Sequence, residues 1–197
     1  MGGSRAFVGV VSVLVFSLIV AQPQAGAEEG WIRSVGGSLG GGASTRTQAV
    51  ILPLELDLGL RLPELLDRPL VDASLRVEWI IKAWVAPIVG QQNTAEVGLN
   101  PIGLRVALDA GQKWVPFAEF GLGILATGLR DVRTGGGFQF NESFGLGLAW
   151  FWTPKSALSV SYRYRHVSNA GIYDRNGGLD TQYALLGIHW FPERVAK

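Results

Sequence analysis

The sequence lacks cysteine, has almost no net charge and contains only two histidines among its 197 residues. Without cysteine there can be neither a disulfide framework nor a thiolate metal site. Two histidines argue against a zinc site, which normally needs three or four protein ligands. With 17 basic and 16 acidic side chains, the basic footprint of a nucleic-acid-binding protein is also absent. We therefore expect no cofactor, no metal and no nucleic-acid partner.

Long apolar runs are also missing beyond the start of the chain, so no later segment predicts a membrane-spanning helix, which needs roughly 20 apolar residues. The start has one positive charge, Arg5, an apolar run over 6–21 and the small-x-small sequence Ala25-Gly26-Ala27. This layout predicts a secretory signal peptide over 1–27, and the short run argues against a retained transmembrane anchor. Export would remove Arg5 from the 17 basic residues, leaving 16 beside 16 acidic ones in residues 28–197.

What the sequence does contain is a repeat of period two. Within 138–150 the large apolar residues fall on even positions, and small or polar residues fall on odd ones. The segments 48–60, 75–85 and 114–128 alternate in the same way. Strict alternation is typical of a half-buried strand. A soluble sandwich alternates too, but aromatic-rich alternating segments of about ten residues behind a signal peptide favour an outer-membrane barrel with its apolar face toward lipid.

The alternating segments predict eight strands, near 32–42, 48–60, 74–88, 95–108, 114–128, 137–151, 157–168 and 180–191. The fourth changes phase near Pro101, where we expect a bulge. A barrel of eight strands is filled by side chains rather than by water. The expected lumen charges are Glu55, Asp57, Glu78 and Glu119, facing Arg76, Lys82, Arg105, Arg163 and Arg165. The predicted fold is thus all-β: an eight-stranded antiparallel transmembrane β-barrel of the bacterial outer membrane, with a plugged lumen.

One strand places polar residues on its apolar face. If Arg163 and Arg165 point into the lumen, His166 and Ser168 lie on the lipid-facing wall. Polar and ionisable groups inside a membrane are costly and usually functional. With both chain ends in the periplasm, odd-numbered strands run outward, so residues 169–179 would form a loop at the cell surface. We expect the following hairpin to be centred near residue 174, which puts Asp180 opposite Ser168 and diagonal to His166, within side-chain reach.

A serine, a histidine and a carboxylate on one patch are the nucleophile, base and orienting acid of acyl-transfer enzymes. The alternative is an interfacial cluster that only contacts lipid head groups, since a histidine and a serine two positions apart are a weak signal. A second carboxylate, Glu142, lies on the outward side of its strand, where an unpaired charge is costly. If the preceding turn is centred near Pro154, Glu142 lies opposite His166, so either carboxylate could orient the histidine.

The segment "RYRHVSNAGIYDRNGGLD" resembles the signature of the lipid A 3-O-deacylase (PagL-type) outer-membrane family, which reads roughly Arg-Tyr-x-His-x-Ser-Asn-Ala-Gly, then Asn-x-Gly and an acidic residue. The blocks "WVPFAEFGLGI" and "GGGFQFNESFGLGLAWF" are similar to the family's fifth and sixth strands. The resemblance covers the C-terminal half, and residues 28 to about 110 match in pattern only. It implies an eight-stranded barrel that hydrolyses the ester-linked acyl chain at position 3 of lipid A.

The resemblance also implies roles for single residues. His166 would be the base, Ser168 the nucleophile and Asp180 the acid, a position where the best-known form of the family has glutamate. The expected oxyanion or supporting groups are Asn169, Gly171 and Asn176, with Glu142, by its place on the neighbouring strand, as a second polar support or a contact to the lipid head group. The expected partners are lipid A or lipopolysaccharide and the outer-membrane lipids. Two other functions stay open, a non-catalytic barrel such as an adhesin or structural protein and an outer-membrane phospholipase, as does the formation of a homodimer.

Overall fold

Nine β-strands in one antiparallel sheet make up most of this computed structural model, which describes residues 30–44, 47–90, 92–129 and 135–194. They belong to one compact unit, Trp31–Lys197. The strands are β1 (Ile32–Ser44), β2 (Ala49–Ile51), β3 (Leu54–Arg61), β4 (Leu75–Gly90), β5 (Thr94–Leu108), β6 (Trp114–Thr127), β7 (Phe138–Phe151), β8 (Ser156–Ser168) and β9 (Leu179–Trp190). The signal peptide expected over 1–27 lies outside the described residues and stays a prediction.

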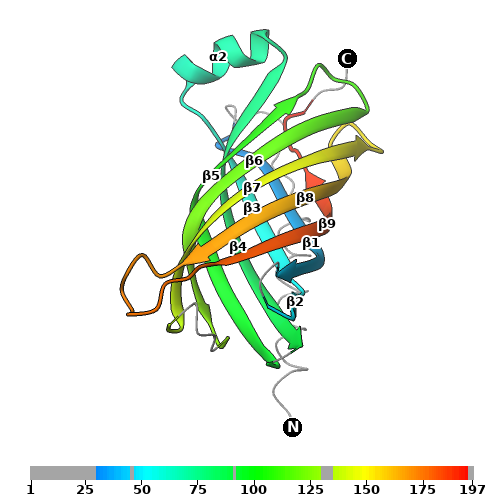
Figure 1. Ribbon diagram of the computed structural model, residues 1–197. Helices are drawn as coiled ribbons and strands as arrows, with labels where there is room; N and C mark the ends of the chain where they lie inside the picture. The colour runs from blue at the N-terminus through cyan, green and yellow to red at the C-terminus, as the bar shows by residue number, and fades with distance from the viewer. Residues whose placement is uncertain (1–29, 45–46, 91, 130–134, 195–197) are drawn as a thin grey trace. The chain divides into compact units, whose positions relative to one another are not determined.

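The sheet closes on itself, because β1 pairs along its length with β9 (Figure 1). The short β2 and the longer β3 both pair with β1 and with β4, so they are two parts of one strand. The interruption falls at Leu52 and Pro53, and proline has no N–H to give to a ladder. The result is a closed barrel of eight antiparallel strands, which confirms the predicted fold, and the predicted strand ends agree within two residues.

The bulge expected near Pro101 is present in β5. The pairing of β5 with β6 shifts register between Leu99 and Ile102, and its pairing with β4 shifts beside the same place. The indole Nε1 of Trp79 donates a hydrogen bond of 2.9 Å to the carbonyl oxygen of Pro101. The bulge removes the Pro101 carbonyl from the strand ladder, and the Trp79 side chain on the outward face supplies its hydrogen bond.

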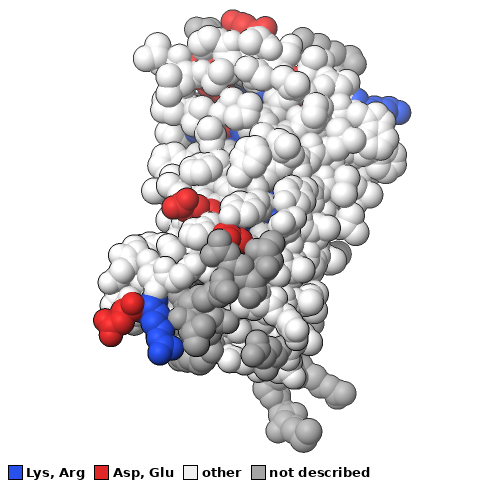
Figure 2. Space-filling view, in the orientation of Figure 1, with Lys and Arg blue, Asp and Glu red and all other residues white. Residues whose placement is uncertain are grey.

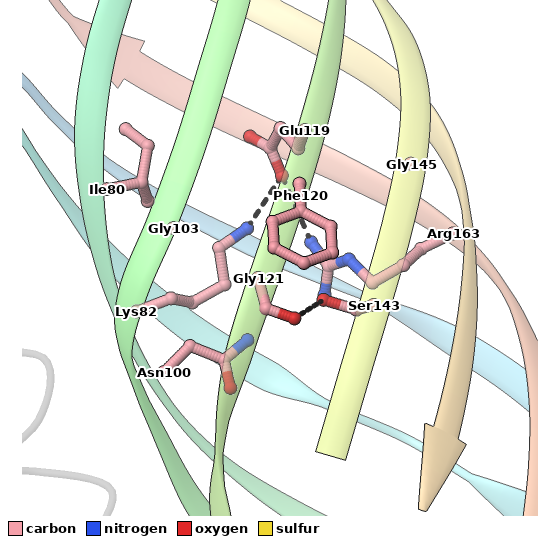
Figure 3. A pocket seen from close by; sticks show the side chains of 10 residues that line it. All are labelled: Ile80, Lys82, Asn100, Gly103, Glu119, Phe120, Gly121, Ser143, Gly145 and Arg163. Carbon is pink, nitrogen blue, oxygen red and sulfur yellow. Dashed lines mark hydrogen bonds and ion pairs between the residues drawn. The ribbon is translucent and has the colours of Figure 1, made fainter.

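The lumen holds the charged network that the alternation predicts. The Arg105 guanidinium lies 2.9 Å from Asp57 and 2.5 Å from Glu119, and the ammonium of Lys82 lies 3.0 Å from Glu119. Figure 3 shows Lys82 of β4 and Arg163 of β8 converging on Glu119 of β6. The space beside them has a volume of about 10 Å³, which is no more than one water molecule needs. Side chains therefore plug this part of the barrel.

Glu96 is a member of this network that the alternation in the sequence did not predict. The Glu96 carboxylate lies 2.5 Å from Arg165 and also accepts a hydrogen bond of 3.2 Å from the Trp84 indole. Glu96 is on the segment whose phase changes at the bulge, so simple alternation did not assign its face. It occupies the lumen near the end of the barrel that carries the β8–β9 loop.

The outer wall of the barrel is apolar. Side chains at even positions of β7 and β8 point outward and are exposed, among them Phe144, Leu146 and Val160 at 50%, 54% and 54%. In Figure 2 a broad band of the visible face is almost free of lysine, arginine, aspartate and glutamate. An apolar band around a barrel with a polar interior is the pattern of a barrel in lipid.

A short helix, α2 (Glu64–Asp72), joins β3 to β4 and was not expected from the sequence. The carbonyl oxygen of Pro63 accepts hydrogen bonds from the backbone N–H groups of Leu66 and Asp67, which begins the helix. Two acidic residues in the first turn suit the positive end of the helix dipole. A search of the described residues finds no helix with the length and apolarity needed to cross a membrane.

Candidate active site

His166 lies between two carboxylates in the strand register. In the β8–β9 ladder it is directly opposite Asp180, and in the β7–β8 ladder it is directly opposite Glu142. The second pairing confirms the prediction from a turn centred near Pro154. The prediction that Asp180 lies opposite Ser168 is wrong, because the β8–β9 hairpin is centred one residue earlier than expected. The error is a register slip of two residues, which changes the partner and keeps the face.

Of the two carboxylates, Asp180 contacts the imidazole. Its Oδ1 lies 2.6 Å from His166 Nδ1, and the Tyr164 hydroxyl donates a hydrogen bond of 2.7 Å to the same oxygen. The Asp180 side chain is 11% exposed and that of His166 is 37% exposed. A mostly buried carboxylate that accepts from Nδ1–H holds the tautomer in which Nε2 is unprotonated. The other ring nitrogen can then accept a proton on the more open side.

Glu142 is exposed on the outward face of β7. In the part of the chain that the structure describes, its carboxylate makes no hydrogen bond or ion pair with His166. Its neighbours on the same face are Phe140 and Phe144, which are 38% and 50% exposed. Glu142 thus borders the histidine without touching it, and it leaves the orienting contact to Asp180.

Ser168 is the last residue of β8 and lies on the same outward face as His166, two residues along the strand. Two residues of a strand span about 7 Å. No hydrogen bond joins the serine hydroxyl to the imidazole among the described residues. Contacts between nucleophile and base are often long before substrate binds. The two side chains share one patch on the outward face of β8.

Gly178 leaves room for the imidazole. Its φ of +67° is in the left-handed region, and a Cβ built on it would lie 2.7 Å from His166 Cε1 and 3.2 Å from Nε2. The distance of 2.7 Å is shorter than real Cβ contacts, and the φ angle is one that L side chains rarely adopt, so a larger residue here would displace the ring. Gly178 therefore helps to place the ring edge that carries Nε2, a role that the turn sequence Asn176-Gly177-Gly178 alone did not reveal.

The β8–β9 loop is organised by Asn169, whose side chain is fully buried. Its backbone N–H donates to Asn176 Oδ1 at 2.9 Å, its side-chain nitrogen donates to the Arg175 carbonyl at 2.6 Å, and its Oδ1 accepts from Gly171 N–H at 2.8 Å. These groups are engaged within the loop. The backbone N–H of Ala170, at a residue with φ of 51°, has no partner in the described part of the chain.

The described residues contain no group of three or more side chains suited to hold a metal ion. The patch consists of Ser168, His166, Asp180 and Tyr164. It lies at the end of the barrel that carries the β8–β9 loop, away from α2 (Figure 1). A histidine oriented by a carboxylate can act as the base for a neighbouring serine hydroxyl, and such a pair can carry out acyl transfer.

A comparison with protein families finds that residues 57–189 match the family model described as lipid A 3-O-deacylase (PagL). The chain belongs to this family. A curated relative, the lipid A deacylase PagL of Bordetella bronchiseptica (strain ATCC BAA-588 / NCTC 13252 / RB50), is 40% identical over 67 residues. That match covers 32% of this chain, and it spans only about a third, 35%, of the relative's length.

Two solved structures are similar in fold. The crystal structure of the outer membrane enzyme PagL is 19% identical, with a TM-score of 0.57 over 78% of this chain and 97% of that one. The crystal structure of Neisserial surface protein A (NspA) is 12% identical, with a TM-score of 0.56 over 81% and 96% of the two chains. The fold of this chain is thus almost equally similar to that of an enzyme and that of a surface protein. The fold alone therefore does not assign the function.

Proposed function

We propose that this chain is an outer-membrane esterase that hydrolyses the ester-linked acyl chain at position 3 of lipid A. The observation that carries the proposal is the contact of His166 Nδ1 with Asp180, 2.6 Å, on the outward face that also bears Ser168. A structural barrel has no need of an oriented imidazole on its lipid-facing wall, where polar groups are costly. Membership of the lipid A 3-O-deacylase family supplies the substrate class.

The reaction follows from the roles of the three side chains. Ser168 Oγ attacks the carbonyl carbon of the ester while His166 Nε2 takes the hydroxyl proton, and Asp180 stabilises the imidazolium. The tetrahedral intermediate collapses as His166 returns the proton to the sugar oxygen, which leaves as the 3-hydroxyl group. The acyl group stays on Ser168 as an ester. A water molecule, deprotonated by His166, then attacks this ester and releases the fatty acid and free Ser168.

The oxyanion of the intermediate needs a hydrogen-bond donor close to Ser168. Asn169, Gly171 and Asn176 were expected as oxyanion or supporting groups. The donors of Asn169 and Gly171 are engaged within the loop, where Asn176 acts as an acceptor through its Oδ1. We assign the role to the backbone N–H of Ala170, two residues after the serine and without a partner among the described residues. Asn169 and Asn176 then support the site by holding the loop that presents this group.

The proposal places the β8–β9 loop at the cell surface and α2 in the periplasm, so that the site meets lipid A in the outer leaflet. The sequence has no cysteine, so a thiol reagent can react only with a cysteine that is introduced. In Asp174→Cys, on the β8–β9 loop, an impermeant thiol reagent should label intact cells. Labelling only after the outer membrane is opened would reverse the topology and remove the access of the site to lipid A.

The decisive experiment compares wild-type protein with Ser168→Ala on purified lipid A and on phospholipid, with fatty-acid release measured by mass spectrometry. We expect the wild type to release the 3-linked acyl chain from lipid A and the variant to lose several orders of magnitude of rate. Release from phospholipid alone would favour a phospholipase. Release at no more than the uncatalysed rate by both folded proteins would leave a non-catalytic barrel, and equal rates above it would show that Ser168 is not the nucleophile.

A further inference from the structure

The helix α2 turns the carboxylate of Asp67 toward the barrel and the side chains of Leu65 and Leu66 away from it. Asp67 is 4% exposed, and its Oδ2 lies 2.5 Å from Arg33 Nη2 and 3.5 Å from Arg61 Nη1. Leu65 and Leu66, by contrast, are 87% and 55% exposed. A helix on the surface of a water-soluble protein has the opposite arrangement, with its apolar side packed on the core.

Four of the five apolar residues of α2 share one side of the helix, and Val71, which is 52% exposed, lies on the other side. Leu65, Leu66, Pro69 and Leu70 follow one another at spacings of one, three and one residues, which places them on one face, opposite Glu64 and away from Asp67. Figure 1 shows the helix at the end of the barrel far from the β8–β9 loop, with its axis running across the strands rather than along them. A helix in this attitude lies parallel to the plane of a membrane that the barrel crosses.

The apolar surface of the barrel wall continues up to this helix. Ile32, Leu60 and Trp79 form an outward row across β1, β3 and β4, and Ile32 and Trp79 are 42% and 47% exposed. Arg61, the next residue after Leu60, holds Asp67 and donates its backbone N–H to the carbonyl of Trp31. Trp31 is 78% exposed. Exposed tryptophans at the end of a barrel wall are typical of the membrane–water interface.

We propose that α2 is an interfacial helix whose apolar face, Leu65 to Leu70, inserts into the phospholipid of the periplasmic leaflet. The inference rests on the proposed placement of the barrel in the outer membrane. The helix carries three acidic residues, Glu64, Asp67 and Asp72, and no basic residue in its last turn. Binding to anionic lipids uses clusters of lysine and arginine. The contact is therefore apolar and needs only zwitterionic phospholipid, with the Asp67 ion pairs fixing which side faces the bilayer.

The test uses single cysteines carrying an environment-sensitive fluorophore, in full-length barrels reconstituted into phosphatidylcholine vesicles. Leu66→Cys reports on the apolar face, and Glu64→Cys is the matched control on the opposite side of the same turn. Leu186→Cys, at a position 63% exposed on the outward face of β9, reports on the barrel wall. We expect nitroxide-labelled lipid to quench the probes at 66 and 186, with blue-shifted emission. Aqueous iodide should instead quench the probe at 64.

Each result decides one point. If the probe at 186 is quenched by lipid while those at 64 and 66 respond alike to iodide, the helix lies in water and the inference is wrong. If lipid quenches the probes at 64 and 66 equally, the helix has no lipid-facing side, and the inference is again wrong. If the probe at 186 is not quenched by lipid, the proposed membrane placement fails, and the inference fails with it.

Discussion

The contact between Asp180 and His166 makes the sharpest prediction. Both Asp180 and Glu142 lie opposite His166, but only Asp180 is in hydrogen-bond contact, at 2.6 Å, and its side chain is 11% exposed. In Asp180→Asn the shape is kept, and the charge that stabilises the imidazolium is lost. The amide can also donate to Nδ1, which would put the ring proton on Nε2 and prevent it from accepting the serine proton.

We expect Asp180→Asn to lower kcat by about 10³- to 10⁴-fold, in line with the loss of the orienting acid in other serine hydrolases. This corresponds to about 4–5.5 kcal/mol of transition-state stabilisation. Glu142→Gln, equally isosteric and uncharged, should stay within about threefold of wild type, because exposed charges without a close partner contribute little. The assay is release of the 3-linked fatty acid from lipid A, with folding checked by heat-modifiable migration on a gel. Loss of fatty-acid release in Glu142→Gln, with a wild-type rate in Asp180→Asn, would refute the assignment.

Three further variants probe the surroundings of the site. Tyr164→Phe removes one donor to Asp180 and should lower kcat by about tenfold, with KM unchanged, because a hydrogen bond to a charged group contributes about 1.5–3 kcal/mol and this tyrosine is partly exposed; an unchanged kcat would contradict this. Gly178→Ala should lower activity and leave the barrel folded, since the new Cβ would displace the His166 ring; wild-type rates would show that the ring does not depend on Gly178. Arg105→Met removes the Arg105 ion pairs of Asp57 and Glu119, of which Glu119 keeps Lys82 and Asp57 loses its arginine partner. The variant should reduce the free energy of unfolding by about 3–5 kcal/mol in a urea titration, as breaking a buried ion pair does; an unchanged midpoint would argue against a stabilising network.

The strands of this barrel could be predicted from the sequence because the side-chain period of a strand is a local property. Lipid and lumen impose opposite demands on successive residues, so alternation between apolar and polar positions appears wherever the barrel wall is formed. For the same reason the outward position of His166 and Ser168 followed from the two arginines before them, Arg163 and Arg165. The register of Glu142 also followed, because the turn between β7 and β8 has only the four residues 152–155.

The register of Asp180 could not be obtained in this way. The β8–β9 loop has the ten residues 169–178, and a register slip of two residues keeps every side chain on its face. The folded loop decided it: Asn169 ties both ends of the loop together, and Gly178 brings the backbone against the imidazole. The contact of Tyr164 with Asp180 depends on the same register, so it too was hidden from the pattern.

Two other features depended on contacts between segments far apart in the sequence. Glu96 reaches Arg165 across the lumen, 69 positions away along the chain, and the bulge in β5 obscured the phase of its own strand. The helix α2 has local signals at its start, but the direction in which it faces is set by Asp67 pairing with Arg33, 34 positions earlier. Outside the bulged strand β5, the sequence by itself determined which residues face lipid and which face the lumen, because that depends on a period of two. Only the tertiary structure decided which carboxylate meets the histidine and which side of the helix is left exposed, because both depend on how distant segments pack.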